Sequence, residues 1–414
     1  MRVSGALLWL GYTIILARSL TKPDFVIALF VINFALIAVL VITLGRDVAL
    51  LRLASQLWGT GNKAMIRALL GRSRRLLVAT GAVLTVALVV GAFAGVQTPV
   101  TQTPLLALLA GLITLAAAQM GLNRECLRAV GCVWQSQLGL NFTRSVVPIV
   151  GSGLVVLAGQ MTVEVALTLF LLSLLLSILI EEAFLRRIDW TTAPDAIAVD
   201  SVDLHRTGLA LWPGDMANAV QMRAAGLVAG LILAPDAAAL VLAAERIAAL
   251  AQFPIAAAAQ AAAPQIARAA VAGQGSLQSA VTQASRLMTI GAISGTAGAA
   301  VVAWPALWAL GPDYVAALPI TIVLIGGHLS WAVFGPAQST LNLTGHSQIY
   351  SRISVAAAIF GTLTIIGGTF WWGGIGAALG FCAVWWATNA AYGYAVHRVT
   401  ETRTGLLSFA KKRH

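Results

Sequence analysis

The segment ARSLTKPDF at residues 17–25 leads into an apolar run, Phe25 to Leu44, which is followed by LGRDVALLRLASQLWGTGNKAMIRALLGRSRR at residues 44–75. The apolar run is long enough to cross a bilayer, since a transmembrane helix needs about 20 predominantly apolar residues. The turn before the run carries Pro23 and Asp24, and the segment after it concentrates arginine and lysine. Because basic loops of membrane proteins stay in the cytoplasm, the stretch predicts a membrane hairpin with a basic inner loop.

The same layout recurs later in the chain. A shift of 212 residues superposes, without a gap, Pro23 and Asp24 on Pro235 and Asp236, Ala49 on Ala261, Gly61 on Gly273, Ala68 on Ala280 and Arg74 on Arg286. A shift of 214 brings LRAVG at residues 127–131 onto LNLTG at residues 341–345. We therefore predict two six-span halves that run in the same direction, related by an axis along the membrane normal. Such a pair of lobes normally encloses a central substrate path.

The composition is typical of a polytopic membrane protein. Of the 414 residues, 59% are hydrophobic and 10% are charged, whereas soluble domains contain about 25% charged residues. The net charge of +11 would suit a nucleic-acid binder only if the basic residues formed a soluble face, but they lie between apolar runs. We therefore exclude nucleic acid as a partner and predict an all-α polytopic fold.

Apolar runs predict about twelve transmembrane helices. They lie near residues 3–17, 25–45, 76–96, 104–120, 136–158, 161–181, 207–233, 238–262, 287–310, 316–338, 351–371 and 373–396. With the N-terminus inside, 21 of the 26 lysines and arginines fall on the cytoplasmic side, two on the outer side and three within spans. This bias places both termini in the cytoplasm. The first span is short, so we expect either that residues precede it or that it begins in the headgroup layer.

The longest polar stretch, RRIDWTTAPDAIAVDSVDLHR at residues 186–206, contains four aspartates and a proline. It predicts a cytoplasmic linker between an N-terminal six-helix lobe, residues 1–185, and a C-terminal six-helix lobe, residues 207–397. Residues 398–414 would form a basic cytoplasmic tail.

Five charged residues lie well inside the predicted spans, where an unpaired ion costs several kcal/mol. They are Arg144 in the fifth span, Asp215 and Arg223 in the seventh, and Glu245 and Arg246 in the eighth. One explanation is that these charges neutralise one another between helices, with Asp215 and Glu245 as counter-ions. We favour a second explanation, because three arginines against two acids leave a net positive interior. That surplus predicts a cavity that receives an anionic group such as a phosphate or pyrophosphate.

Further candidates lie at the mouths of the predicted path and in the backbone. Arg18 is near the outer mouth, while Arg46 and Arg52 are near the inner one; for each, contact with substrate and ordinary interfacial snorkelling are both open. In the seventh span Pro213 and Gly214 predict a bend or break, which makes them hinge candidates, although a harmless kink is the alternative.

No motif for catalysis or cofactor binding is present. The three cysteines lack metal-ligand spacing and predict free thiols. The sequence contains no Walker A loop, Rossmann glycine pattern, zinc motif or nucleophile elbow. We therefore expect no cofactor, no metal site and no enzymatic activity.

Several segments resemble a known group of transporters. They are ARSLTKPDF at residues 17–25, LGRDVALLRLASQLWGTGN at 44–62, APQIARAAVAGQG at 263–275, LGPDYVAALPITIVLIGG at 310–327 and STLNLTGHSQ at 339–348. On these segments the chain resembles the polysaccharide or O-antigen flippases of the multidrug/oligosaccharidyl-lipid/polysaccharide (MOP) exporter superfamily. The resemblance implies two six-helix lobes around a central cavity that opens alternately to the two membrane faces.

The resemblance also implies a function. Members of this branch are thought to move undecaprenyl-pyrophosphate-linked sugar units to the outer leaflet of the bacterial inner membrane, holding the pyrophosphate with cationic cavity residues. By this analogy Arg144, Arg223 and Arg246 are candidate ligands, and the substrate is a lipid-linked oligosaccharide. Other polysaccharide assembly proteins are potential partners.

Two other functions stay open. A cation-coupled multidrug antiporter of the same superfamily needs intramembrane carboxylates; the first span has none, but Asp215 and Glu245 supply two. A membrane-embedded glycan polymerase or ligase would be expected to carry a sizeable outer loop with polar catalytic residues. The outer loops are short, for example GVQTPVTQTP at residues 95–104, which counts against the enzyme.

Overall fold

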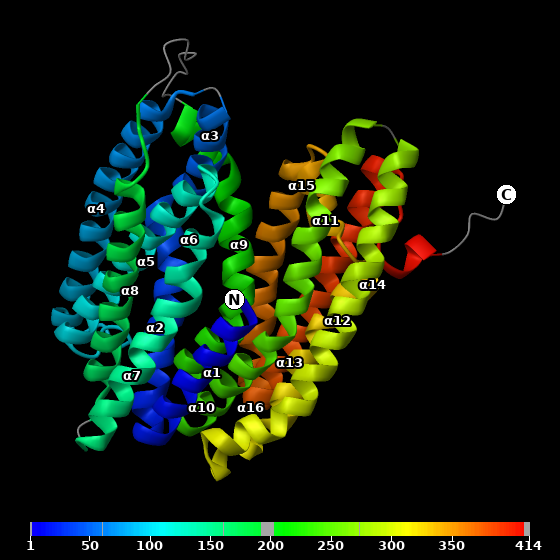
Figure 1. Ribbon diagram of the computed structural model, residues 1–414. Helices are drawn as coiled ribbons and strands as arrows, with labels where there is room; N and C mark the ends of the chain where they lie inside the picture. The colour runs from blue at the N-terminus through cyan, green and yellow to red at the C-terminus, as the bar shows by residue number, and fades with distance from the viewer. Residues whose placement is uncertain (1, 60, 160, 192–202, 273, 410–414) are drawn as a thin grey trace. The chain divides into compact units, whose positions relative to one another are not determined.

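The computed structural model describes residues 2–59, 61–159, 161–191, 203–272 and 274–409, and the regular elements of these ranges are all helices (Figure 1). In chain order they are α1 (Arg2–Ser19), α2 (Lys22–Thr43), α3 (Arg46–Gly59), α4 (Lys63–Phe93), α5 (Pro104–Ala129), α6 (Val133–Leu138), the π-helix η1 (Gly139–Thr143), α7 (Arg144–Leu157), α8 (Val163–Arg186), α9 (Asp203–Ile232), α10 (Pro235–Ala248), the 3₁₀ helix η2 (Ala249–Ala251), α11 (Gln252–Ala272), α12 (Gln274–Leu310), the 3₁₀ helix η3 (Pro312–Ala317), α13 (Leu318–His328), α14 (Ser330–Phe334), α15 (Ala337–Leu343), α16 (Ser347–Thr400) and the 3₁₀ helix η4 (Gly405–Phe409). The predicted all-α polytopic fold is confirmed.

These helices account for all twelve predicted spans. Nine segments of the described chain are long and apolar enough to cross a membrane. The shorter α1 and the helix α9 match the first and seventh predicted spans. The 54-residue α16 covers the last two, and its helical geometry is interrupted at Trp372 and at Gly373, where φ is 57° and ψ is −139°. Only glycine adopts such a conformation readily, so Gly373 marks the turn between the eleventh and twelfth spans.

The chain forms two compact units, Met1–Met216 and Ala217–His414, and the boundary between them lies inside α9. The predicted linker, residues 186–206, includes residues 192–202, which lie outside the described residues. Of its first part, Arg186 ends α8 and residues 187–191 follow that helix directly.

In the first unit α5 is the central helix, because α2, α3, α4 and α8 all pack against it. Helix α7 lies between α1 and α8, in contact with both. A buried apolar cluster joins α3, α4 and α5 and includes Leu50, Leu57, Ile66 and Leu122. Full burial of such a side chain from water stabilises the fold by about 1.5–3 kcal/mol, so this cluster anchors one end of the unit.

The corner between α2 and α3 is a left-handed turn at Leu44, with φ of 50°, and Gly45, with φ of 73°. A Cβ atom at Gly45 would overlap the carbonyl of Gly208 in α9. Next to this contact, the Trp212 Nε1 donates a hydrogen bond of 2.7 Å to the Leu40 carbonyl oxygen. The start of α9 is therefore held against the end of α2.

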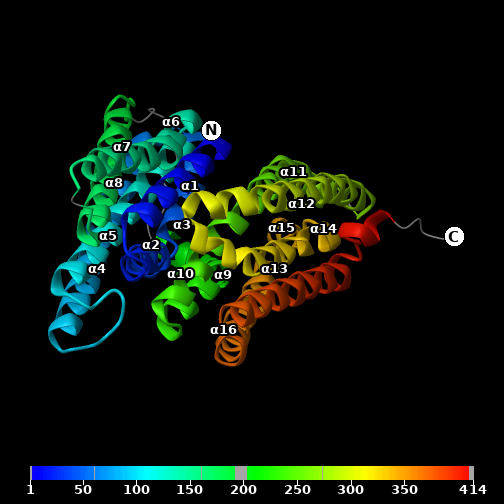
Figure 2. The same cartoon turned by 90° about the horizontal axis from the view of Figure 1, so that it is seen from below.

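In the second unit α12 and α16 organise the packing. Helix α12 contacts α10, α11, α13 and α14, and α16 contacts α10, α13, α14 and α15. Figure 2 shows α11 lying along α12, and α13 along α16. Between α14 and α15 the chain passes through Gly335, with φ of 62°, and Pro336. Proline has no N–H for the helical hydrogen-bond pattern, so the helix breaks there.

The end of the described chain folds back onto α12. The Gly405 amide donates to the Ser285 Oγ at 3.0 Å. Gln278 donates from Nε2 to the Arg403 carbonyl oxygen at 3.1 Å and accepts from the Arg403 amide at 2.8 Å. The predicted basic tail, residues 398–414, is thus packed on the second unit as far as Phe409, and residues 410–414 lie outside the described residues.

Candidate functional site

Three of the predicted site residues gather between α9 and α10 in the second unit. The charges of Glu245 and Arg246 both act on Arg223, whose Nη1 donates to the Ala219 carbonyl oxygen at 3.3 Å. Gly226 lies one turn after Arg223, and a Cβ atom there would overlap the Glu245 carboxylate. Glycine at this position therefore lets α9 receive the Glu245 side chain. Two guanidinium groups and one carboxylate leave this cluster with a net positive charge.

The local sequence explains how α10 carries its part of this cluster. Pro235 stands in the first turn of α10, where a proline is tolerated because the first N–H groups of a helix have no partner inside it. Arg246 lies in the last turn, directly before η2, where a positive charge suits the negative end of the helix dipole. Glu245 and Arg246 are thus held near the same end of one helix.

Arg144 lies in the first unit, at the start of α7. Its guanidinium carbon is 5.3 Å from the centre of the Trp9 ring on α1, a distance typical of a cation–π contact. The helix before it is the π-helix η1, and Pro148 follows one turn later inside α7. Since Pro148 cannot donate a hydrogen bond to the Arg144 carbonyl, the backbone is irregular on both sides of this arginine, as is frequent at functional sites.

The other candidates from the seventh span lie in the first unit. Helix α9 runs through Pro213 and Gly214 without leaving the helical conformation, so their role as a hinge stays a prediction. The charge of Asp47 in α3 acts on Asp215. Asp215 is therefore subject to the charge of another acid in this unit, whereas Glu245 is the acid whose charge acts on Arg223.

The three candidates at the mouths have different environments. Arg46 is buried, and its guanidinium donates from Nε to the Thr43 carbonyl oxygen at 2.8 Å and from Nη2 to the Ile42 carbonyl oxygen at 2.5 Å. These bonds satisfy carbonyl groups at the end of α2, which have no partner inside the helix. Burial lowers the pKa of Arg46, and the nearby Asp47 opposes this effect. Arg18 and Arg52 are exposed.

The structure also shows an ion-pair network that the sequence analysis missed. It lies where the start of α4 meets the ends of α5 and α8. Arg74 pairs through Nη2 with Glu182 at 2.5 Å and donates to the Asn123 Oδ1 at 2.8 Å. Glu125 accepts from Arg124 at 2.8 Å and from Arg128 at 2.6 Å. The spacing of three residues between Glu125 and Arg128 was a signal for part of this network.

A second missed residue is Glu181 in α8. Its side chain is fully buried, and neither carboxylate oxygen has a hydrogen-bond partner among the described residues. It lies against Gly139, the first residue of η1, where a Cβ atom would be 2.8 Å from Oε1. The sequence placed Glu181 only at the end of its span. Among the described residues, no group of three or more His, Cys, Asp or Glu side chains is placed to hold a metal ion.

Comparison with known proteins identifies the fold. No family model matches the chain, and a search of curated sequences gave no match. Among solved structures, an inward-facing multidrug resistance MATE family transporter of the MOP superfamily aligns over 96% of this chain and 95% of its own, with a TM-score of 0.75 and 16% identity. A MOP superfamily transporter from Pyrococcus furiosus aligns over 97% and 96%, with a TM-score of 0.57 and 16% identity.

A lipid II flippase has a similar fold. The lipid II flippase MurJ, in an inward closed conformation, aligns over 95% of this chain and 85% of its own, with a TM-score of 0.63 and 13% identity. These neighbours are transporters and flippases rather than enzymes. The resemblance inferred from the sequence is confirmed at the level of architecture: this multi-pass membrane protein has the fold of the MOP superfamily.

Proposed function

We propose that the protein flips a polyprenyl-pyrophosphate-linked oligosaccharide across the bacterial inner membrane by alternating access, for surface polysaccharide biosynthesis. The observation that carries this proposal is the cluster of Arg223, Glu245 and Arg246 between α9 and α10. One carboxylate balances one guanidinium, so the cluster has positive charge left over for an anion. Arginine suits a phosphate because its planar fork of N–H donors matches the phosphate oxygens.

Arg144 supports the same proposal from the first unit. It is the third of the intramembrane arginines named from the sequence, and its backbone is irregular because of η1 and Pro148. In the proposed mechanism the cluster of Arg223, Glu245 and Arg246 holds the pyrophosphate while the sugar head crosses a hydrated path and the polyprenyl tail stays in lipid. The cytoplasmic termini inferred from the charge bias belong to this proposal, as does the lobe division drawn at residues 186–206.

A cation-coupled multidrug antiporter is the second candidate. The observation that favours it is Glu181, a fully buried carboxyl without a hydrogen-bond partner among the described residues. A carboxyl within a membrane span commonly marks an ion pathway or a proton relay. The likeness to a multidrug resistance transporter agrees with this function as well. No observation of comparable weight favours the polymerase or ligase.

The test compares Arg223→Gln and Arg246→Gln with the same change at Arg268, an exposed residue of α11 in the same unit. The readout is the leaflet in which lipid-linked glycan intermediates accumulate, probed in cells with an impermeant sugar-modifying reagent. We expect both cluster variants to trap intermediates on the cytoplasmic side at unchanged protein level, and Arg268→Gln to export normally. Normal export in both cluster variants would overturn the assignment of the site.

The antiporter is tested in the same cells. If drug efflux depends on the protein and is lost in Glu181→Gln, while glycan intermediates never accumulate, the second candidate replaces the first.

Arg223→Lys tests how Arg223 contacts the pyrophosphate of the flippase substrate, because lysine keeps the positive charge and lacks the planar fork of N–H donors. Partial recovery of export in this variant would support bidentate contact with a phosphate.

A further inference from the structure

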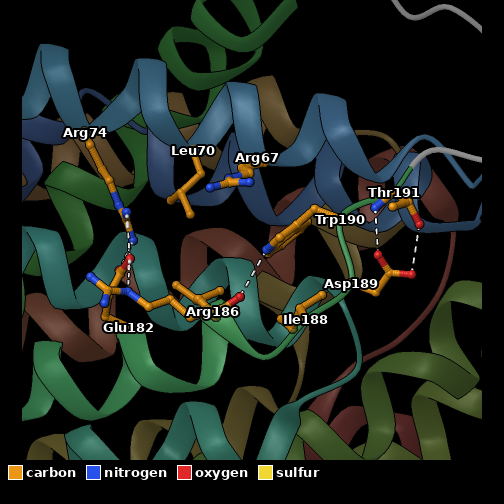
Figure 3. A pocket seen from close by; sticks show the side chains of 10 residues that line it. Arg67, Leu70, Arg74, Glu182, Arg186, Ile188, Asp189, Trp190 and Thr191 are labelled. Carbon is orange, nitrogen blue, oxygen red and sulfur yellow. Dashed lines mark hydrogen bonds and ion pairs between the residues drawn. The ribbon is translucent and has the colours of Figure 1, made fainter.

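A cavity of about 430 Å³ opens in the first unit between α4, α8 and the segment that follows α8. Its volume lies within the range of roughly 300–1,000 Å³ that is usual for ligand pockets. The residues that line it are Arg67, Leu70, Arg74, Glu182, Leu185, Arg186, Ile188, Asp189, Trp190 and Thr191. Figure 3 shows Arg67 and Arg74 on α4 facing Glu182, Arg186 and Trp190. None of these residues belongs to the site proposed for the transported substrate.

Three arginines and two acids line the cavity. Glu182 pairs with Arg74 at 2.5 Å. Asp189 accepts hydrogen bonds from the amide and the hydroxyl of Thr191 at 3.0 and 2.9 Å, and the charge of Lys63 also acts on it. The Thr191 hydrogen bonds lower the pKa of Asp189, so that it stays ionised. With both acids ionised, the three arginines of the lining leave the cavity with one net positive charge.

Two arginines of the cavity remain available to a ligand. Arg67 has no ion pair or hydrogen bond within the described part of the chain, and it is exposed. Arg186 approaches Glu182 only at 4.0 Å, with its side chain 80% exposed. Trp190 also lines the cavity, and its Nε1 is fixed by a hydrogen bond of 3.1 Å to the Leu185 carbonyl oxygen. Two guanidinium groups beside a rigid aromatic wall suit a phosphate group.

The surface next to the cavity is apolar, which suits a phosphate group that belongs to a membrane lipid. On α8, helical spacing of three and four residues puts Glu182 and Arg186 on one face with three exposed leucines. These are Leu172, Leu175 and Leu179. On α4 the exposed Val78 continues the face that carries Arg67 and Arg74, and only 11% of the apolar part of this helix is buried. Both helices therefore pass directly from a bare apolar surface to the cavity, as expected where acyl chains end and headgroups begin.

We propose that this cavity binds the phosphate group of an anionic membrane lipid. Arg67 and Arg186 hold the phosphate, Arg74 is kept in place by Glu182, and the acyl chains lie along the exposed faces of α4 and α8. The same phosphate chemistry could be supplied by a soluble polyphosphate, so the test must separate the two sources. The proposal does not depend on the transported substrate.

The test uses the full-length protein purified in detergent and examined by native mass spectrometry with three probes. The probes are phosphatidylglycerol, the zwitterionic phosphatidylethanolamine, and inorganic pyrophosphate. We expect the wild type to retain one phosphatidylglycerol more strongly than phosphatidylethanolamine. The double variant Arg67→Gln with Arg186→Gln should bind phosphatidylglycerol roughly tenfold more weakly, because it loses two charge-assisted contacts. The matched control is Arg72→Gln, an exposed arginine of α4 that does not line the cavity.

Three outcomes would overturn the proposal. Unchanged retention of phosphatidylglycerol by the double variant would show that the cavity holds no lipid. An equal loss in Arg72→Gln would show that the attraction is only the general positive charge of this region. Retention of pyrophosphate without retention of lipid would overturn the lipid as the source of the phosphate. Normal elution of the double variant in size-exclusion chromatography verifies that it is folded.

Discussion

The helices α4 and α12 are counterparts in the two repeats, since the 212-residue shift places Arg74 on Arg286. The segments of chain that lie beside these two helices nevertheless differ. After α8 the described residues 188–191 lie beside α4, at a cavity lined by arginines. After α16 the chain packs onto α12 as far as Phe409, whose ring centre lies 5.9 Å from the Arg286 guanidinium carbon. Among the described residues, the same place in the fold is therefore filled by the protein's own chain in the second unit and forms a cavity in the first.

The helix breaks of the two units also lie at different positions of the repeat. In the first unit Leu44 and Gly45 turn the chain between α2 and α3, whereas their counterparts in the second unit, Ala256 and Ala257, lie inside α11. Conversely, Gly335 and Pro336 interrupt the second unit, while their counterparts under the 214-residue shift, Gly121 and Leu122, lie inside α5. A repeated pattern of spans thus permits different corners, because a single glycine or proline decides each one.

The largest effect is expected from Gly405→Val, which should detach the C-terminal segment from α12. Gly405 has φ of 59°, and a Cβ atom there would overlap the Val333 carbonyl. We expect a loss of about 3 kcal/mol of stability, from backbone strain together with lost packing. Thermal unfolding of the purified protein measures it. Gly131→Val is the control, because Gly131 has φ of 84° and open space around its Cβ position, so it should cost only the strain of about 1–2 kcal/mol.

Gly45→Ala should be the next largest, because it acts on the corner that only the first unit has. A Cβ atom at Gly45 would overlap the Gly208 carbonyl, so we expect a loss of about 2 kcal/mol. Gly95→Ala, at φ of 79° with nothing within 4 Å, controls for the strain alone. Equal unfolding temperatures for the two variants would contradict the close packing of α9 on this corner.

Glu182→Gln should sharpen the difference between the two units at the ends of α4 and α12. It removes the acid that pairs with Arg74 and adds positive charge to the cavity. Both side chains are about a quarter exposed, so we expect to lose about 1 kcal/mol or less. At the same time, phosphatidylglycerol should be retained more strongly in native mass spectra. Weaker retention would mean that Glu182 mainly serves to position Arg74.

Asp47→Asn should have the smallest effect, and it should depend on pH. Burial raises the pKa of Asp47, while backbone N–H groups and Arg124 oppose the rise and Glu125 adds to it. Because the folded pKa lies above the unfolded one, ionisation costs stability as pH rises from about 4 through the raised value. The asparagine variant lacks this loss, so its unfolding temperature should exceed that of the wild type by about 2 °C at neutral pH and match it in acid.

The counterpart of Asp47 under the 212-residue shift is Ala259, so this pH dependence should belong to the first unit alone. Asp189→Asn provides a contrast of opposite sign. The pKa of Asp189 is lowered by its hydrogen bonds with Thr191, so its contribution to stability is present above the usual pKa and lost as the pH falls. A pH profile of Asp47→Asn that parallels the wild type would show that this carboxyl is solvated.

The sequence was enough to name most residues of the candidate site, but it could not show which of them lie near one another. Arg223, Glu245 and Arg246 stood out because charge is rare in apolar spans. Their meeting was open, since Asp215 was an equal candidate as counter-ion of Arg223. In the structure Glu245 lies near Arg223 because Gly226 leaves room for the Glu245 side chain. Nothing in the sequence distinguishes this glycine from the other glycines among the 39 in the chain. The sequence also could not predict that Arg46 donates hydrogen bonds to the carbonyl groups at the end of α2, because this contact depends on where α2 ends.

The sequence by itself determined the all-helical fold, the twelve spans, the two repeats and the bias of basic residues, because apolar length and loop charge are local properties. Only the tertiary structure decided which charged groups meet. Arg74 and Glu182 are 108 residues apart, and their pairing depends on how each helix is rotated about its axis. A span that is apolar all round, such as α2, carries little record of that rotation. Small residues that permit close approach set it instead, and their effect appears only when the helices are packed.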